Sequence, residues 1–208
     1  MIIHAQNERL AAITNAYENQ LYGGDFEVRL PDIESWLTSP MFYWSICSNK
    51  ALPTRLEDIQ GSLSILAVSE GDATALLANQ IREADLRPWI PSSGERGALY
   101  FCSYSLAVAG AGRQQFRLAQ DYFAKMTCFD LSPPVMAFSI AATEGGATHL
   151  ERSGFFAVSG SYLGKYAIYR AGCSHKRQLS RVWAALLRCE MNTNSRSLSP
   201  ATREFVPA

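Results

Sequence analysis

The sequence predicts an α/β (or α+β) fold, in which a mixed central sheet carries helices on its faces. Strand-like and helical patterns alternate along most of the 208 residues, and such alternation is typical of sheets covered by helices. The stretch GALYFCSYSLAVA, residues 97–109, is apolar enough to form a central strand that is covered on both faces. Hydrophobic residues make up 48% of the chain, so it can bury a sizeable core.

The N-terminal part is predicted to begin with an amphipathic helix over residues 5–21, where apolar side chains recur at helical spacing. FEVRL (26–30) alternates like a short strand. Pro31 can open a short helix over residues 31–37, because proline is favoured in the first helical turn. MFYWSIC (41–47) is aromatic and β-branched, which indicates a strand or a buried turn.

Residues 62–81 contain two apolar runs on either side of Glu70-Gly71-Asp72. These three residues are a turn signal, so the pattern predicts a β-hairpin. The polar stretch 82–97 follows and contains two prolines. We expect it to loop over one face of the domain.

The predicted central strand ends at the glycine-containing residues 109–112 (AGAG). Residues 113–126 then place apolar side chains on one side of a helix. Residues 135–143 read as a second buried strand, and Thr143 at its end can cap the next helix.

Gly154 is placed to end the helix that Thr143 begins, because glycine readily adopts the left-handed conformation found there. Residues 155–171 indicate two strands with a bend near 160–164. Residues 174–208 are predicted to form a helix followed by a polar, serine-rich and mobile tail.

Composition argues against several classes of protein. Lys and Arg number 19, as do Asp and Glu, and this zero net charge argues against DNA binding through a basic surface. The five cysteines are odd in number and lack metal-binding spacing, so we expect reduced thiols, no metal and a cytoplasmic location. The N-terminus has no signal-peptide pattern, and no apolar run approaches the roughly 18 residues of a membrane span, so no membrane insertion is expected.

Three local features occur in a familiar order. A buried strand runs into a glycine loop and a helix at 97–126. A second strand and helix follow at 135–152 and end in Ser-Gly-Phe at 153–155. The stretch SYLGKYAIYR (161–170) is a strand rich in tyrosine that ends in a basic residue. In this order the features resemble the GNAT superfamily of acetyl-CoA-dependent N-acetyltransferases.

The resemblance covers roughly residues 60–171. It implies a single GNAT-like domain over residues 1–173, with a C-terminal helix and tail at 174–208. It also implies an enzyme that transfers an acetyl or other acyl group from acyl-CoA to a primary amine of a small molecule or protein by direct attack. Acetyl-CoA is the expected co-substrate, and a homodimer is an open alternative.

In this family, backbone N–H groups of the glycine loop bind the CoA pyrophosphate. A helix N-terminus offers unpaired donors and the positive end of the helix dipole, and glycine lets the backbone approach the phosphates. The resemblance places CoA binding at Ser103, Tyr104, Leu106, Ala109, Gly110, Ala111, Gly112, Arg113 and Gln114.

Two positions depart from the family pattern. Ala107 stands where the family loop usually has Gln or Arg, and Leu150 stands where it often has a tyrosine that protonates the leaving thiolate. These departures leave two alternatives open. One is a GNAT-fold binding or regulatory protein without catalysis. The other is an acyltransferase that uses long-chain acyl-CoA or acyl carrier protein, which the aromatic stretch 41–46 favours.

The candidates for the acid that protonates the thiolate are Tyr162, Tyr166 and His149. Strand packing is the alternative explanation for both tyrosines, as it is for Tyr169, because aromatic residues favour strands. The alternative for His149 is an ordinary place on the surface of a helix.

Glu144 and Glu95 are candidate bases that would take the proton of the amine. Glu144 follows the end of a buried strand, and its alternative role is an acidic residue in the first turn of a helix. Cys102 is a weaker candidate for a nucleophile, because no Cys-His-Asp order accompanies it and cysteine is often simply buried.

Overall fold

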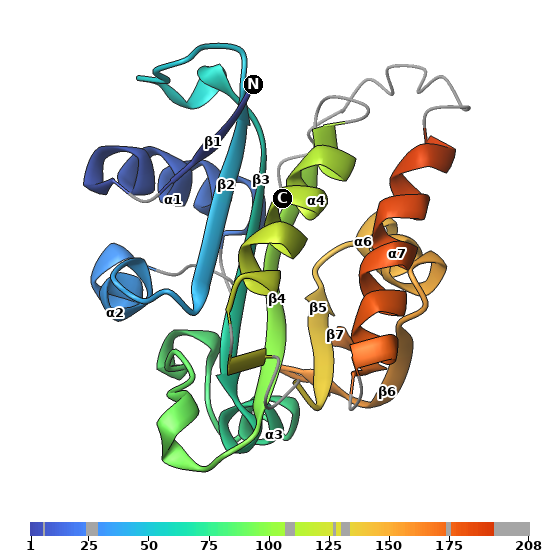
Figure 1. Ribbon diagram of the computed structural model, residues 1–208. Coiled ribbons are helices and arrows are strands. Elements are labelled where there is room, and N and C mark those ends of the chain that lie inside the picture. The colour runs from blue at the N-terminus through green and yellow to red at the C-terminus, as the bar shows by residue number, and fades with distance from the viewer. Residues whose placement is uncertain are drawn as a thin grey trace.

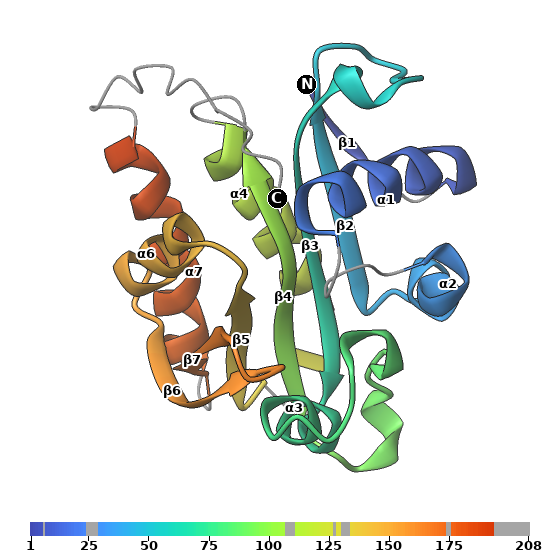
Figure 2. The ribbon, with the colours of Figure 1, turned by 180° about the vertical axis from the view of Figure 1, so that it is seen from behind.

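In the computed structural model, the described residues form a seven-stranded mixed sheet with helices on both faces (Figures 1 and 2). The strand order is β1-β2-β3-β4-β5-β7-β6. Neighbouring strands are antiparallel except β4 and β5, which are parallel. The predicted fold class is therefore confirmed. The structure describes residues 1–5, 7–23, 29–106, 111–126, 128–129, 134–173 and 176–193.

The elements alternate along the chain as the sequence pattern predicts. The strands are β1 (Ile2–His4), β2 (Phe42–Ser48), β3 (Ile59–Ser69), β4 (Gly97–Leu106), β5 (Met136–Ala141), β6 (Phe156–Tyr162) and β7 (Tyr166–Gly172). The α-helices are α1 (Glu8–Tyr22), α2 (Glu34–Leu37), α3 (Glu70–Leu77), α4 (Ala111–Ala124), α6 (Glu144–Arg152) and α7 (Lys176–Thr193). Short 3₁₀ turns include η2 (Leu30–Ile33) and η4 (Glu83–Asp85).

Each face of the sheet has its own hydrophobic core, because side chains alternate between the faces along every strand. On β3, Leu63 and Ile65 pack in the core that α4, α6 and α7 cover. Leu66 and Val68 of the same strand pack in the core under α1, α2 and α3. Figure 1 shows α4 and α7 in front of the sheet, and Figure 2 shows α1 and α3 from the other side.

The predicted hairpin over residues 62–81 is wrong. Its first run lies within β3, but its second run is helix α3. The Ser69 side chain accepts a hydrogen bond from the backbone N–H of Asp72, with 3.0 Å between N and Oγ, and so caps the helix. Strand β3 already pairs with β2 on one edge and β4 on the other, so no edge remains for a hairpin partner.

The remaining sequence predictions have mixed outcomes. Residues 41–47 are a strand rather than a buried turn, since β2 occupies Phe42–Ser48. The strand predicted at 26–30 falls mostly outside the described residues, and residue 30 begins η2. Thr143 caps α6, and Gly154 follows that helix with φ of +83°.

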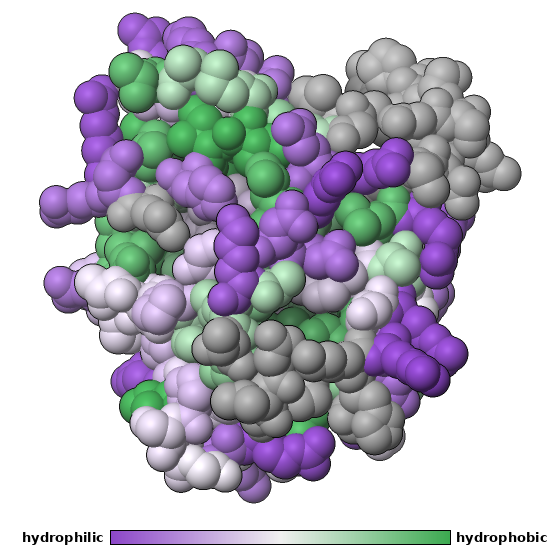
Figure 3. All heavy atoms as spheres, viewed as in Figure 1, coloured by the Kyte–Doolittle hydropathy of each residue, from purple (hydrophilic) through white to green (hydrophobic). Residues whose placement is uncertain are grey.

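Helix α7 packs on the sheet rather than standing apart from it. Trp183 and Leu186 are buried in the core shared with α4, and the ring of Trp183 lies 5.8 Å from that of Phe101 on β4. The face of the molecule that is turned to the viewer in Figure 1 has hydrophilic residues interspersed with hydrophobic areas (Figure 3). Within the part of the chain that the structure describes, no helix combines the length and apolar character needed to cross a membrane.

Candidate active site

The central sheet splits between its two parallel strands. Strands β4 and β5 pair from Leu99↔Ala137 to Phe101↔Ser139. Beyond these pairs β4 continues beside β3, whereas β5 continues beside β7 (Figure 2). The Ser139 hydroxyl donates to the Phe101 carbonyl at 2.9 Å, where the split begins. The ends of two parallel strands therefore diverge, which is where α/β proteins commonly bind ligands.

A β-bulge lies at the same point on β4. Ser64 of β3 pairs with Ser103, and the next residue of β3 pairs with Phe101, so Cys102 is an extra residue on β4. A bulge bends its strand and increases the local twist, and bulges occur often beside active sites. The bulge turns the last residues of β4 away from β5 and so helps to open the split.

A cavity of about 120 Å³ occupies the split and extends to both faces of the sheet. The strands contribute Ser64, Phe101, Cys102, Ser103, Ser139, Ile140 and Ala141, with Ala142 just beyond β5. One side, here named the α1-side wall, consists of Asn15, Glu18, Asn19, Tyr22, Ile33, Trp36, Phe42, Trp44 and Glu83. The other, the α6-side wall, consists of Tyr104, Phe116, Thr143, Gly146, His149, Leu150 and Leu186.

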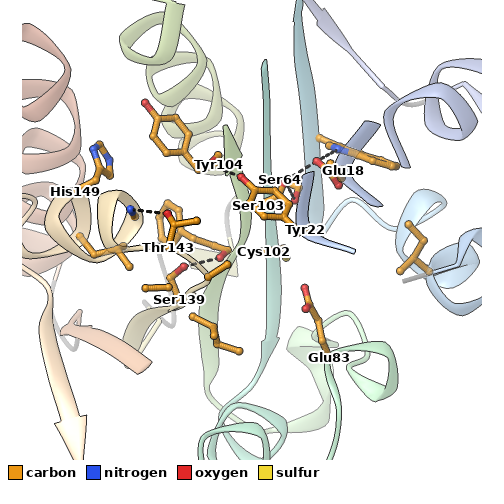
Figure 4. A pocket seen from close by; sticks show the side chains of 18 of the residues that line it. Glu18, Tyr22, Ser64, Glu83, Cys102, Ser103, Tyr104, Ser139, Thr143 and His149 are labelled. Atoms are coloured by element: carbon orange, nitrogen blue, oxygen red, sulfur yellow. Dashed lines mark hydrogen bonds between the residues drawn. The ribbon is translucent and has the colours of Figure 1, made fainter. Parts of the chain in front are cut away.

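Glu18 of α1 is joined to the split by hydrogen bonds. Its carboxylate accepts from the indole N–H of Trp44, with 3.1 Å between Nε1 and Oε1, and from the hydroxyl of Ser103 on β4 (Figure 4). Burial raises the pKa of Glu18, and its hydrogen bonds oppose that rise. Nearby, the Tyr22 hydroxyl donates to the Tyr104 carbonyl at 2.8 Å and ties the end of α1 to β4.

Glu83 in η4 is the second carboxyl group of the α1-side wall. Its side chain is buried, and burial raises its pKa to about 8, with a smaller contribution from the charge of Glu18. The side chain of Tyr100 hydrogen-bonds to it. Its backbone N–H donates to the Tyr162 hydroxyl at 3.3 Å. Glu83 is therefore mainly protonated at pH 7.

The α6-side wall is built from residues along α6 and its N-cap, together with one residue each from β4, α4 and α7. Thr143 caps α6 by accepting from the N–H of Gly146 at 3.0 Å. The His149 ring lies 4.8 Å from that of Tyr104 and 6.1 Å from that of Phe116, measured between centroids. Burial lowers the pKa of His149 to about 4, so the imidazole is neutral at pH 7. His149 and Glu18 lie on opposite sides of the pocket (Figure 4).

The predicted CoA-binding residues fall in three places. Ser103 and Tyr104 line the cavity. Leu106 ends β4, and Ala111 and Gly112 begin α4, with exposed Arg113 and Gln114 in its first turn. Ala109 and Gly110 lie outside the described residues, so the glycine loop itself stays a prediction.

Of the predicted acids, His149 lines the cavity. Tyr162 is buried beside Glu83 and not in the lining, and Tyr166 is half-buried on β7 under the ammonium of Lys165. Tyr169 is buried outside the lining, where its hydroxyl donates to Glu151 at 3.1 Å.

Of the predicted bases, Glu144 is exposed in the first turn of α6, and Glu95 is exposed in the loop before β4. Neither belongs to the cavity lining. Cys102 does line the cavity, but burial raises the pKa of its thiol well above the usual value. A thiol that stays protonated is a poor nucleophile. Among the described residues, no cluster of three or more His, Cys, Asp or Glu side chains is arranged to hold a metal ion.

Sequence reasoning missed Glu18 and Glu83. A signal for Glu18 exists, because Thr14, Glu18 and Tyr22 follow one another at i, i+4 spacing on the helix face that begins with buried Leu10. The inner face of α1 thus turns polar toward its C-terminal end, as expected beside a site. Glu83 has no such signal, since it lies in a polar loop.

Comparison with known proteins gives similarities of fold only. No family model matches the chain, and no curated protein matches it significantly. Arabidopsis thaliana NAA60 in complex with a bisubstrate analogue is similar with a TM-score of 0.49 and 10% identity, over 83% of this chain and 98% of that chain. FeeM, an N-acyl amino acid synthase from uncultured soil microbes, is similar with a TM-score of 0.42 and 16% identity, over 83% and 94%. At such values the function must be argued from the cavity itself.

Proposed function

We propose that this chain is an N-acyltransferase that transfers an acyl group from acyl-CoA to an amine. The observation that carries the proposal is the cavity between β4 and β5, which reaches both faces of the sheet. Such a passage lets a donor and an acceptor meet from opposite faces at the same strand edge. A direct transfer requires that the two reactants be held in line.

The donor would lie against the α6-side wall. This wall is mostly apolar, and the start of α4, where the resemblance places CoA binding, follows the end of β4. A pyrophosphate there would meet the N-terminus of a 14-residue helix, with Arg113 in its first turn. Acetyl-CoA is the donor that we favour.

The acceptor would approach from the α1-side wall, where Glu18 is the proposed base. Its raised pKa makes it a better proton acceptor than an ordinary carboxylate, and it is hydrogen-bonded to Ser103 at the split. An ammonium group that enters this wall would give a proton to Glu18. The free amine then has a lone pair for attack.

The transfer is direct. The amine nitrogen attacks the thioester carbonyl and forms the C–N bond, while backbone N–H groups at the β4 bulge would stabilise the carbonyl oxygen. Collapse breaks the C–S bond, and the sulfur leaves as thiolate. The proton still on nitrogen passes to sulfur, which gives free CoA, and Glu18 returns its proton to water. Of the predicted acids, His149 is best placed to donate a hydrogen bond toward the sulfur, as a neutral imidazole.

The test is a thermal-shift series with acetyl-CoA, CoA and a long-chain acyl-CoA, followed by thiol release with a panel of amines. A ligand at about 100 times its dissociation constant stabilises the fold by roughly 2.7 kcal/mol, which is readily detected. A shift and amine-dependent thiol release support the proposal. A shift without thiol release favours the binding-protein alternative, and the absence of any shift overturns acyl-CoA use.

A further inference from the structure

The carboxyl groups of the cavity lining both lie on the α1-side wall. Among the described residues that line the cavity, Glu18 and Glu83 are the only carboxyl groups, and the lining includes neither lysine nor arginine. His149, across the cavity, is neutral at pH 7. Any charge that develops on the described lining at neutral pH is therefore negative. A buried negative charge is stable only when a positive group or several hydrogen bonds accompany it.

The rest of this wall is aromatic and apolar. The ring centroids of Trp36 and Phe42 lie 5.6 Å apart, as do those of Phe42 and Trp44. Both indole N–H groups are already used, since Trp36 donates to the Leu86 carbonyl and Trp44 donates to Glu18. The two indoles therefore offer a ligand mainly carbon surface. Such a surface binds an apolar body, and aromatic faces also attract a cation.

Carboxyl groups set in an aromatic wall fit one kind of ligand. We propose that the acceptor is a monocationic primary amine with an aryl or alkyl body and no carboxylate. This inference rests on the proposed function, because it names the substrate class for the same cavity. The ammonium group of this amine lies between Glu18 and Glu83, and the apolar body of the amine packs on Trp36 and Phe42.

An α-amino acid does not fit this wall. Its carboxylate would lie within a few atoms of the ammonium group and would thus face Glu18, or Glu83 once the ammonium group favours its ionised form. The described lining contains no lysine or arginine that could neutralise this carboxylate. Juxtaposed like charges cost several kcal/mol, so the wall discriminates against acids as well as selecting cations.

Glu83 also links amine binding to proton release. With its pKa near 8, it is mainly protonated at pH 7, and the titratable groups around it are Tyr100 and Cys102 of β4, Tyr162 of β6 and Glu18 of α1. An ammonium group beside it favours the ionised form and lowers that pKa. Binding of the amine at pH 7 therefore releases protons, whereas binding of a neutral analogue does not.

The test compares amines with acids in which a carboxylate replaces a hydrogen atom or a terminal methyl group, namely phenethylamine against phenylalanine and hexylamine against 6-aminohexanoate. With acetyl-CoA as donor, we expect the kcat/KM of each amine to exceed that of its acid partner at least about a hundredfold. The carboxylate of phenylalanine would face the carboxyl groups of the wall, whereas that of 6-aminohexanoate would be buried against the aromatic rings without a positive partner, and either arrangement costs several kcal/mol. Calorimetry of amine binding in two buffers of different ionisation enthalpy should show proton release at pH 7. Equal or better use of the amino acids would overturn the inference and leave the acyltransferase proposal intact.

Binding alone separates the two proposals. If acetyl-CoA produces no shift but phenethylamine binds and phenylalanine does not, the cation pocket stands and the acyltransferase proposal fails. If neither member of either pair binds, the inference fails. Glu83→Gln should reduce the preference for amine over acid at least about tenfold, which corresponds to 1.4 kcal/mol. Glu57→Gln, at an exposed residue outside the lining, is the matched control and should leave the preference unchanged.

Discussion

On the α1-side wall of the cavity, the carboxyl groups of Glu18 and Glu83 lie among aromatic side chains. On the α6-side wall, the neutral imidazole of His149 lies among mostly apolar side chains. Burial acts on both walls but with opposite results. It raises the pKa of Glu18 and Glu83 and lowers that of His149, since low polarity disfavours the charged form of every group.

On the proposed function, this difference suits the two walls to different partners. The α1-side wall gains a charge when a cation arrives, so it suits an ammonium group that must lose a proton. The α6-side wall has no ready charge at pH 7, so it suits the uncharged thioester and its acyl chain. The split between β4 and β5 lets the two meet, and changes to either wall should affect one partner and spare the other.

The largest expected effect comes from Glu18→Gln. The amide keeps the shape of the side chain but cannot accept the proton of the amine. General-base catalysis typically contributes about 10²–10⁴-fold, so kcat/KM should fall at least a hundredfold. The thermal shift with acetyl-CoA should persist, because the proposed donor site is on the other wall.

The control for this variant is Glu34→Gln, at an exposed residue of α2 outside the lining. It should keep the wild-type kcat/KM. Full activity of Glu18→Gln would show that the proton leaves by another route. Loss of the acetyl-CoA shift in Glu18→Gln would show that the two walls are not separate.

The second largest effect should come from Gly146→Leu on the α6-side wall. Leucine is favoured over glycine in a helix by close to 1 kcal/mol, and the nearest atom to the new Cβ is Thr143 Oγ at 3.3 Å, so we expect the fold to survive. The side chain would enter the space of the donor and weaken acetyl-CoA binding at least about tenfold, or 1.4 kcal/mol. Titration of the thermal shift against acetyl-CoA concentration measures this change.

Gly145→Leu is the matched control in the same turn. Gly145 is exposed and outside the lining, so its variant should bind acetyl-CoA as the wild type does. Equal binding by both leucine variants would place the donor elsewhere. Weaker binding by Gly145→Leu alone would point to the outer surface of α6 instead of the cavity.

Much of the fold could be predicted from local patterns. Strands β4 and β5 are nearly continuous apolar runs. A run of that length between turn signals leaves few alternatives to a buried strand. The error over residues 62–81 arose because a short apolar run fits a buried helix as well as a strand. Ser69 followed by an acid three residues later is a helix-start signal, and it decides the case in favour of α3.

The candidate site was less predictable, for a physical reason. Glu18 is visible as a polar residue on an inner helix face, but its meaning depends on Ser103, 85 residues away. The pKa of Glu83 is raised by burial and, to a smaller extent, by the charge of Glu18, which lies far away in the sequence on another helix. A pKa set by desolvation is a property of what packs around a group, and local sequence does not contain that information.

The third prediction concerns stability and Glu83. The folded protein holds this proton up to about pH 8, whereas a carboxyl group in the unfolded chain loses it near 4.5. Between these values the unfolded chain binds fewer protons, so the free energy of unfolding falls as pH rises, by at most about 1.4 kcal/mol per unit. Glu83→Gln should flatten this decline in denaturant unfolding at pH 5, 6.5 and 8. Parallel slopes for the variant and the wild type would contradict the assigned environment.

The smallest effect should come from His149→Phe, and its sign is opposite. The folded protein keeps His149 neutral down to about pH 4, whereas the unfolded chain binds a proton near 6.5. Between these values the unfolded chain binds more protons, so the free energy of unfolding falls as pH falls. His149→Phe, which keeps a ring against Tyr104 and Phe116, should lessen this acid destabilisation and leave the decline above pH 6.5 unchanged. If it altered the alkaline side instead, the two walls would not titrate independently.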